Sequence, residues 1–225
     1  MNEKEIFREL YKRKLIKTLK DKPGGWKLVS GIWSPFYIQL RLLPSHPDLL
    51  NEIGKLLGER IKEYGNKLLG IAMAGIPIAT SISLHVNMPL CYTRKIVGAK
   101  KVEEIEKYAR QYGEHSLVEG EINEGDEFIA IDDIVTKFDS KLIAIKQLEI
   151  EAEKRECNIK CKHVAVVIDR QQGAEEIAKR YGIKIHSLIK FKEAIEWIKD
   201  EMDEEYEIIR NYLNNPEKYR REKDI

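Results

Sequence analysis

The sequence alternates short apolar runs with segments of helical periodicity, and this alternation leaves few possible folds. Five apolar runs are typical of strands and cover residues 68–74, 89–94, 128–135, 163–169 and 183–189. Helical patterns cover residues 3–20, 47–64, 75–85, 139–156, 174–181 and 191–213. Strands and helices that alternate at this spacing form βαβ units. We therefore predict an α/β fold with a central parallel sheet of about five strands, flanked by helices.

Polar residues or glycine follow four of these predicted strands. The loops are residues 74–75, 94–95, 132–136 and 169–173. In a parallel sheet the loops after the carboxyl ends of the strands gather at one edge, and ligands bind there. The sequence therefore predicts a functional site that these four loops share.

Composition and charge exclude several classes of protein. The 225 residues include 39 Lys+Arg and 38 Asp+Glu, which leaves a net charge of +1 and argues against nucleic acid as the main partner. No apolar run approaches the ~18 residues that span a bilayer, and the first residues lack the apolar core of a signal peptide. The three cysteines cannot form a four-thiolate zinc site. We expect a cytoplasmic protein with no membrane partner.

Two adjacent acids, Asp132 and Asp133, end the predicted strand 128–135 and precede Thr136. Carboxylates in such a loop can bind two ribose hydroxyls, or a hydrated Mg²⁺ beside a pyrophosphate. The hydroxyl of Thr136 can cap the next helix or bind phosphate. The alternative interpretation is an acidic turn whose only role is to start the helix.

Cations follow the strand 89–94. Arg94 and Lys95 lead into a segment, residues 95–116, that is rich in Lys and Glu and has no apolar face. Cations on a mobile loop can close over a departing pyrophosphate, so we expect residues 97–112 to be mobile without ligand. The alternative is a solvated loop of mixed charge. Arg170, after the strand 163–169, either pairs with an anionic ligand through its planar guanidinium group or belongs to an ordinary polar turn.

Six segments in the same order resemble the orotate phosphoribosyltransferase family. They are SGIWSPFYIQLR (30–41), AGIPIAT (74–80), YTRK (92–95), YGEHSLVEG (112–120), FIAIDDIVT (128–136) and VVIDRQQG (166–173). The resemblance implies the type I phosphoribosyltransferase fold, with residues 1–225 forming a single domain. Residues 1–45 and part of 190–225 would form a hood over the sheet, and the chain would form a homodimer.

The resemblance also implies a reaction and its residues. Ribose 5-phosphate would pass from phosphoribosyl pyrophosphate (PRPP) to orotate, with Mg²⁺ as cofactor, to give orotidine 5′-monophosphate (OMP) and pyrophosphate. The catalytic residues would be Arg94, Lys95, Arg110 and Asp133. PRPP would contact Arg94, Lys95, Asp132, Asp133, Ile134, Val135, Thr136, Lys137 and Ser140. Orotate would contact Phe36, Thr136 and Arg170. Mg²⁺ would be held through PRPP, with Asp132 and Asp133 as its candidate side-chain ligands.

The segment after the acid pair departs from the family pattern. The family carries glycine there, so that backbone amides approach the 5′-phosphate, whereas this chain has Thr136-Lys137-Phe138-Asp139-Ser140. If Phe138 and Asp139 fill the phosphate pocket, PRPP cannot bind. Two alternatives therefore stand beside the orotate enzyme: a transferase that acts on another base, and a catalytically weak paralogue that senses a nucleotide or regulates.

Overall fold

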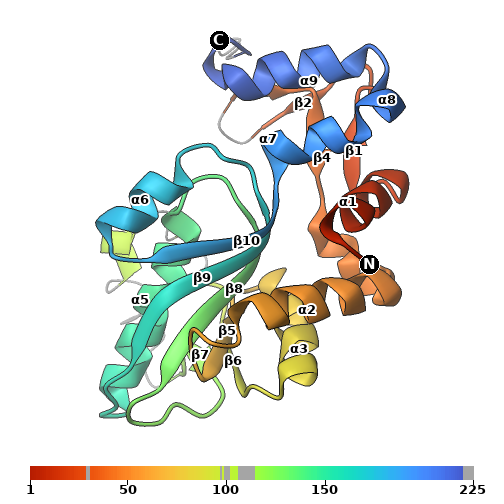
Figure 1. Cartoon of the computed structure of the whole chain (residues 1–225). Coiled ribbons are helices and arrows are strands. Elements are labelled where there is room, and N and C mark those ends of the chain that lie inside the picture. Colours follow the sequence, from red (N-terminus) through yellow and green to blue (C-terminus); the bar gives the residue numbers. More distant parts are fainter. Residues whose placement is uncertain (29–30, 97, 99–101, 106–114, 220–225) are drawn as a thin grey trace.

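The computed structural model describes residues 1–28, 31–96, 98, 102–105 and 115–219, and its centre is a six-stranded sheet (Figure 1). The strand order is β10-β9-β8-β5-β6-β7, and all neighbours are parallel except β6 and β7. The strands are β5 (Lys67–Gly70), β6 (Leu90–Thr93), β7 (Val118–Glu119), β8 (Glu127–Val135), β9 (Lys160–Asp169) and β10 (Lys184–Lys190). The predicted α/β fold is confirmed, with an antiparallel edge strand, β7, that the prediction lacked.

Helices cover both faces of the sheet, as the alternation of buried side chains along β8 requires. Ile129 and Ile131 pack in one core with α2 (Pro47–Ile61) and α3 (Gly75–Val86). Phe128 and Ala130 pack in a second core with α5 (Asp139–Lys154) and α6 (Ala174–Arg180). Both faces are therefore buried, which explains why the central strands are apolar along most of their length.

The N-terminal and C-terminal parts of the chain lie together beside the sheet (Figure 1). The N-terminal part contains α1 (Glu3–Lys12), β1 (Ile16–Thr18), β2 (Trp26–Lys27), β3 (Trp33–Ser34), β4 (Phe36–Ile38) and η1 (Leu40–Ser45). The C-terminal part contains α7 (Phe191–Ala194), η3 (Ile195–Ile198), α8 (Lys199–Met202), α9 (Glu205–Asn214) and η4 (Pro216–Tyr219). Aromatic contacts join the two parts, because Phe7 and Phe36 both pack against Phe191.

Two predicted helices were wrong in extent. The helix predicted over residues 3–20 ends at Lys12, and residues 16–18 form β1, which pairs antiparallel with β4. Lys14 has a φ of 61°, a left-handed conformation that stops the helix. The helix predicted over residues 191–213 is broken into four short elements, with a positive φ of 51° at Asp203. In the described part of the chain, no helix is long and apolar enough to cross a membrane.

The bend between β8 and α5 shows whether Phe138 and Asp139 fill the predicted phosphate pocket. Its side chain is fully buried in the core beneath α5, with Val135 and Leu142, and does not line the cavity described below. Asp139 is exposed and begins the helix. Neither side chain fills the space at the strand end, because the bend turns Phe138 inward.

Replacing Phe138 with alanine is therefore expected to act on stability. Removing a fully buried aromatic ring leaves a cavity, and the free energy of unfolding should fall by about 3–5 kcal/mol. Chemical denaturation measures this change. Tyr181→Ala is the matched control, because that ring is 49% exposed, and its effect should stay within about 1 kcal/mol. A loss of similar size in both variants would contradict the buried position of Phe138.

Candidate functional site

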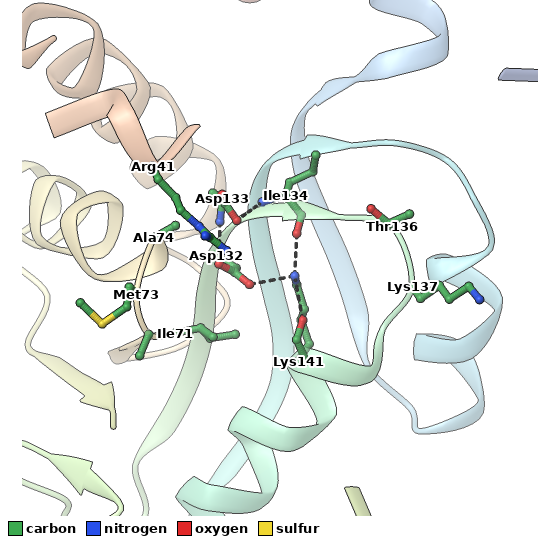
Figure 2. A pocket seen from close by; sticks show the side chains of 12 residues that line it. Arg41, Ile71, Met73, Ala74, Asp132, Asp133, Ile134, Thr136, Lys137 and Lys141 are labelled. Carbon is green, nitrogen blue, oxygen red and sulfur yellow. Dashed lines mark hydrogen bonds and ion pairs between the residues drawn. The ribbon is translucent and has the colours of Figure 1, made fainter. Parts of the chain in front are cut away.

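A cavity of about 300 Å³ lies at the carboxyl ends of β5 and β8 (Figure 2). Four segments line it: Arg41 in η1, residues 71–74 after β5, residues 132–134, 136 and 137 at the end of β8, and residues 140–141 in the first turn of α5. The cavity lies at the predicted edge of the sheet, where parallel strands bring their following loops together. Of the four loops that the sequence assigned to one site, only two line it, 74–75 through Ala74 and 132–136, whereas residues 94–95 and 169–173 do not.

The acid pair enters the cavity from the last residues of β8. Asp132 is 8% exposed, and its Oδ1 accepts a hydrogen bond of 2.9 Å from the backbone N–H of Asp133. Asp133 in turn accepts 2.8 Å from the backbone N–H of Ile134 through its own Oδ1. Each carboxylate is thus oriented by the next amide along the chain.

A buried lysine lies against the acid pair (Figure 2). The Nζ of Lys141 is 2.8 Å from Oδ2 of Asp132, and it donates to the carbonyl of Ile134 at 2.6 Å. A third, longer contact of 3.3 Å reaches Oγ of Ser140. The side chains of Lys141 and Asp132 are only 4% and 11% exposed, so the pair is shielded from solvent.

Burial and the neighbouring charge of Asp132 raise the pKa of Asp133 from 3.8 to about 7, although Lys141 opposes the shift. Desolvation is the larger cause, because a carboxylate loses hydration inside the protein. Asp133 therefore changes its charge close to neutral pH. A carboxyl group with that pKa can exist in either protonation state at the cavity under ordinary conditions.

The raised pKa predicts how stability depends on pH. Between about pH 4 and pH 7 the folded state keeps a proton that unfolded Asp133 releases, so this group's contribution to stability falls as the pH rises through 7. Asp133→Asn removes the buried charge and should be more stable than the wild type at pH 8 by roughly 1–3 kcal/mol. The difference should disappear near pH 4. Thermal denaturation at both pH values measures it, and equal differences at pH 4 and 8 would contradict the shift.

The first turn of α5 faces the same cavity. No side chain caps this helix, and its first backbone bonds run from Lys141 and Leu142 to the carbonyl of Phe138. Amides at a helix N-terminus lack partners within the helix and bind anions. Thr136, Lys137 and Ser140 surround this position as lining residues, whereas Val135 is buried in the core. The arrangement suits a phosphate group even without glycine.

Arg94 and Lys95 leave the sheet beside the cavity but do not line it. The hydroxyl of Thr93, the residue before Arg94, accepts a hydrogen bond of 3.0 Å from the N–H of Ala72 in the cavity lining. Arg94 is exposed, and its guanidinium group lies 3.5 Å from Glu119. Lys95 is exposed as well.

Two side chains of α5 hold the backbone on either side of residues 95–116. Gln147 donates 2.8 Å to the carbonyl of Arg94, and Glu151 accepts 2.8 Å from the N–H of Leu117. The N–H of Arg94 also donates to the carbonyl of Leu117. The start and the return of this segment are therefore fixed against the helix. Arg110, and most of the span 97–112 for which we predicted mobility, lie outside the described residues.

Arg170 and Phe36 meet away from the cavity lining. The guanidinium carbon of Arg170 lies 4.9 Å from the centre of the Phe36 ring, and Tyr212 packs edge-on against the same ring. Burial lowers the pKa of Arg170, while Tyr212 acts in the opposite direction. Among the described residues, Nε and Nη2 of Arg170 are buried without a hydrogen-bond partner. Such unpaired donors are costly, and a ligand anion would satisfy them.

Sequence reasoning missed five lining residues: Arg41, Ile71, Ala72, Met73 and Lys141. Arg41 closes the segment 30–41, which was singled out without giving this residue a role. Lys141 gave no signal, because a lysine in a helical pattern usually indicates a solvated face. Within the described ranges no group of three or more His, Cys, Asp and Glu side chains could hold a metal ion.

Comparison with known proteins agrees with the geometry. No family model matches the chain. The orotate phosphoribosyltransferase of Methanocaldococcus jannaschii is 31% identical over 186 residues, which cover 81% of this chain and 96% of that protein. The orotate phosphoribosyltransferase of Staphylothermus marinus is 31% identical over 217 residues, which cover 93% of this chain and 94% of that protein. The solved orotate phosphoribosyltransferase of Aeropyrum pernix has a TM-score of 0.65 at 25% identity, over 86% of this chain and 98% of that one.

The fold and its cavity define a type I phosphoribosyltransferase, with a mostly parallel sheet that carries the acid pair at the end of β8. The expected fold class is thus confirmed. The identity to the curated relatives over nearly their whole length decides the branch. The chain belongs to the orotate phosphoribosyltransferase family, as the sequence motifs implied.

Proposed function

We propose that the chain transfers ribose 5-phosphate from PRPP to orotate, giving OMP and pyrophosphate. One observation carries the proposal: the acid pair of β8 and the uncapped N-terminus of α5 line a single cavity. Carboxylates suit the hydroxyls and developing positive charge of a ribose, and helix amides suit its 5′-phosphate. The names of the curated relatives support the same reaction.

The cations at the start of the 95–116 segment complete the chemistry. When pyrophosphate leaves the ribose, negative charge accumulates on its oxygens and must be neutralised. Arg94 and Lys95 follow a strand whose end is hydrogen-bonded to the cavity lining, and this proximity supports a contact with the pyrophosphate. Arg110 is proposed to act with them on the resemblance alone.

Mg²⁺ is the proposed cofactor, carried by PRPP. Asp132 and Asp133 are the carboxylates at the cavity, and Asp132 is already paired with Lys141. Two carboxylates do not form an all-protein cage, but Mg²⁺ commonly binds through one or two carboxylates, several waters and substrate phosphates. The donor set therefore fits a metal that arrives with its substrate and neutralises pyrophosphate charge.

Orotate is proposed to bind beside Arg170. The base carries a carboxylate, and the unpaired Nε and Nη2 of Arg170 are the two donors that a bidentate contact to such a group would use. Both atoms are buried in this structure, so the proposal requires Arg170 to turn toward the base when it binds. Phe36 holds the guanidinium plane on its ring face. Phe36 itself is 1% exposed, so it supports Arg170 and does not offer a ring face to the base.

The remaining expectations stay proposals that rest on the family resemblance. We infer a homodimer in the cytoplasm and a single domain in which residues 1–45 and part of 190–225 form a hood. The contacts of Phe7 and Phe36 with Phe191 support the hood, because they join both ends of the chain in one cluster.

The catalytic assignment predicts large losses of turnover in two variants. Asp133→Asn removes the charged group beside the ribose, and Arg94→Ala removes a cation from the pyrophosphate. Each should lower kcat/KM for PRPP at least about tenfold, equivalent to ~1.4 kcal/mol, in an assay of OMP formation with PRPP, Mg²⁺ and orotate. Arg180→Ala, an exposed change on α6, is the control and should keep full activity.

Absence of OMP formation by the wild-type chain would overturn the proposed reaction. If other bases then accept ribose 5-phosphate, the chain is a transferase for another base. If PRPP or a nucleotide binds without reaction, the regulatory paralogue is the better account. Both outcomes are read in the same experiment by supplying alternative bases and by titrating PRPP.

The orotate site predicts a loss that is selective for one substrate. Arg170→Lys keeps the charge but loses the planar pair of donors, and Arg170→Met loses both. KM for orotate should rise at least about tenfold in each variant, with the larger effect in Arg170→Met, because an unpaired carboxylate loses more than ~1.4 kcal/mol. KM for PRPP should change less than about threefold. Steady-state kinetics with each substrate varied in turn decide this, and equal effects on both KM values would contradict the assignment.

A further inference from the structure

We propose that Lys141 is a positioning residue of this site: it binds Asp132 as its counterion and fixes the end of β8, so that Asp133 is the carboxylate that meets the ribose. The inference rests on the proposed function and deepens it. It divides the acid pair into two different roles, whereas the sequence treats the two residues as equivalent.

The ammonium group of Lys141 is held by groups of the protein on several sides. An ammonium group has three N–H donors. The group donates to the carbonyl of Ile134 at 2.6 Å and to Ser140 Oγ at 3.3 Å, and it forms an ion pair with Asp132 Oδ2 at 2.8 Å. All three acceptors belong to the chain, so Lys141 acts through its neighbours and not on the substrate directly.

Asp132 is held from both sides by the protein. Its Oδ2 is bound by Lys141, and its Oδ1 accepts from the backbone N–H of Asp133. Figure 2 shows the Asp132 carboxylate joined to Lys141, while the contact drawn from Asp133 runs to Ile134. A ribose hydroxyl would have to compete with a buried ammonium group for Asp132, whereas no cation is paired with Asp133 among the described residues.

Lys141 is positioned to connect the end of β8 to the start of α5. Lys141 lies in the first turn of α5, and Asp132 and Ile134 lie in β8 on the other side of the bend 136–138. The bond to the Ile134 carbonyl and the bond to Asp132 therefore connect the strand to the helix across the bend. This bend carries Phe138 where the family has glycine, so its conformation is set by side chains: Phe138 from the core and Lys141 from the cavity.

Burial makes the pair interdependent. Removing one partner of a buried ion pair leaves the other charge uncompensated, and the loss is larger than the net value of the pair. The single variants Lys141→Met and Asp132→Asn should each disturb the end of β8. The double variant restores charge balance with side chains of similar size, so it should be no worse than the single variants. A direct ribose ligand at Asp132 would behave differently, because its loss would add to the loss of Lys141.

The test is a double-mutant cycle read by PRPP binding and by OMP formation. Lys141→Met and Asp132→Asn should each raise KM and Kd for PRPP about tenfold, with KM for orotate within about twofold of the wild type. The double variant should lie within about threefold of either single variant, and not near the product of the two effects. Lys141→Arg should recover most of the affinity for PRPP. Lys146→Met is the control on the same helix and should leave both substrates unaffected.

The outcomes separate this inference from the proposed function. Multiplicative effects in the cycle, or an unchanged KM for PRPP in Lys141→Met, would overturn the positioning role while OMP formation by the wild type persists. If Lys141→Met fails to fold, the comparison uses Asp132→Asn, Lys141→Arg and the double variant Lys141→Met/Asp132→Asn. The inference then requires that the double variant and Asp132→Asn have similar Kd values for PRPP. If the wild type forms no OMP, the proposed function fails, and isothermal titration with PRPP and Mg²⁺ then tests the inference. Multiplicative effects of the two substitutions on Kd for PRPP, or no binding of PRPP, would overturn it.

Discussion

The ion pair between Lys141 and Asp132 is the interaction on which the site depends. It is buried, and it connects the last residues of the central strand β8 to the first turn of α5. Removing two charges from water is costly, and the attraction between them offsets that cost only if the geometry is good and further hydrogen bonds are made. The bonds of Lys141 to Ile134 and Ser140 supply them. The pair thus sets where the acid pair and the helix amides lie relative to each other.

The same interaction accounts for a bend without glycine. In the family pattern glycine lets the backbone approach a phosphate, since it has no side chain in the way. Here the bulky residue at the bend, Phe138, points into the core beneath α5 instead of into the cavity. The backbone of the bend is held by the packing of Phe138 in the core on one side and by the contacts of Lys141 with Asp132 and Ile134 on the other. The uncapped N-terminus of α5 still faces the cavity, so the loss of glycine does not by itself remove the proposed anion site.

The sequence predicted the sheet and the acid pair well, because both rest on strong local patterns. An apolar run bounded by polar residues is a strong signal for a buried strand, and strands that alternate with helices form a parallel sheet. The sequence did not predict the local structure of residues 13–20. Residues 16–18 and 36–38 form a two-stranded pair only because residues distant in sequence pack around them, and tertiary context overrode the helical pattern of residues 3–20. Lys141 was missed for a related reason: its burial depends on Asp132, nine positions away along the chain, and no periodicity reveals that pairing.

The central claim is that the bend 136–140 and the first turn of α5 still form a phosphate site. A crystal structure with inorganic phosphate tests it most directly. The account predicts a phosphate bound by the backbone amides of this turn and by the hydroxyls of Thr136 and Ser140, with Phe138 still in the core and Lys141 still on Asp132. A structure in which Phe138 or Asp139 occupies this space, with no anion bound at millimolar phosphate, would contradict it.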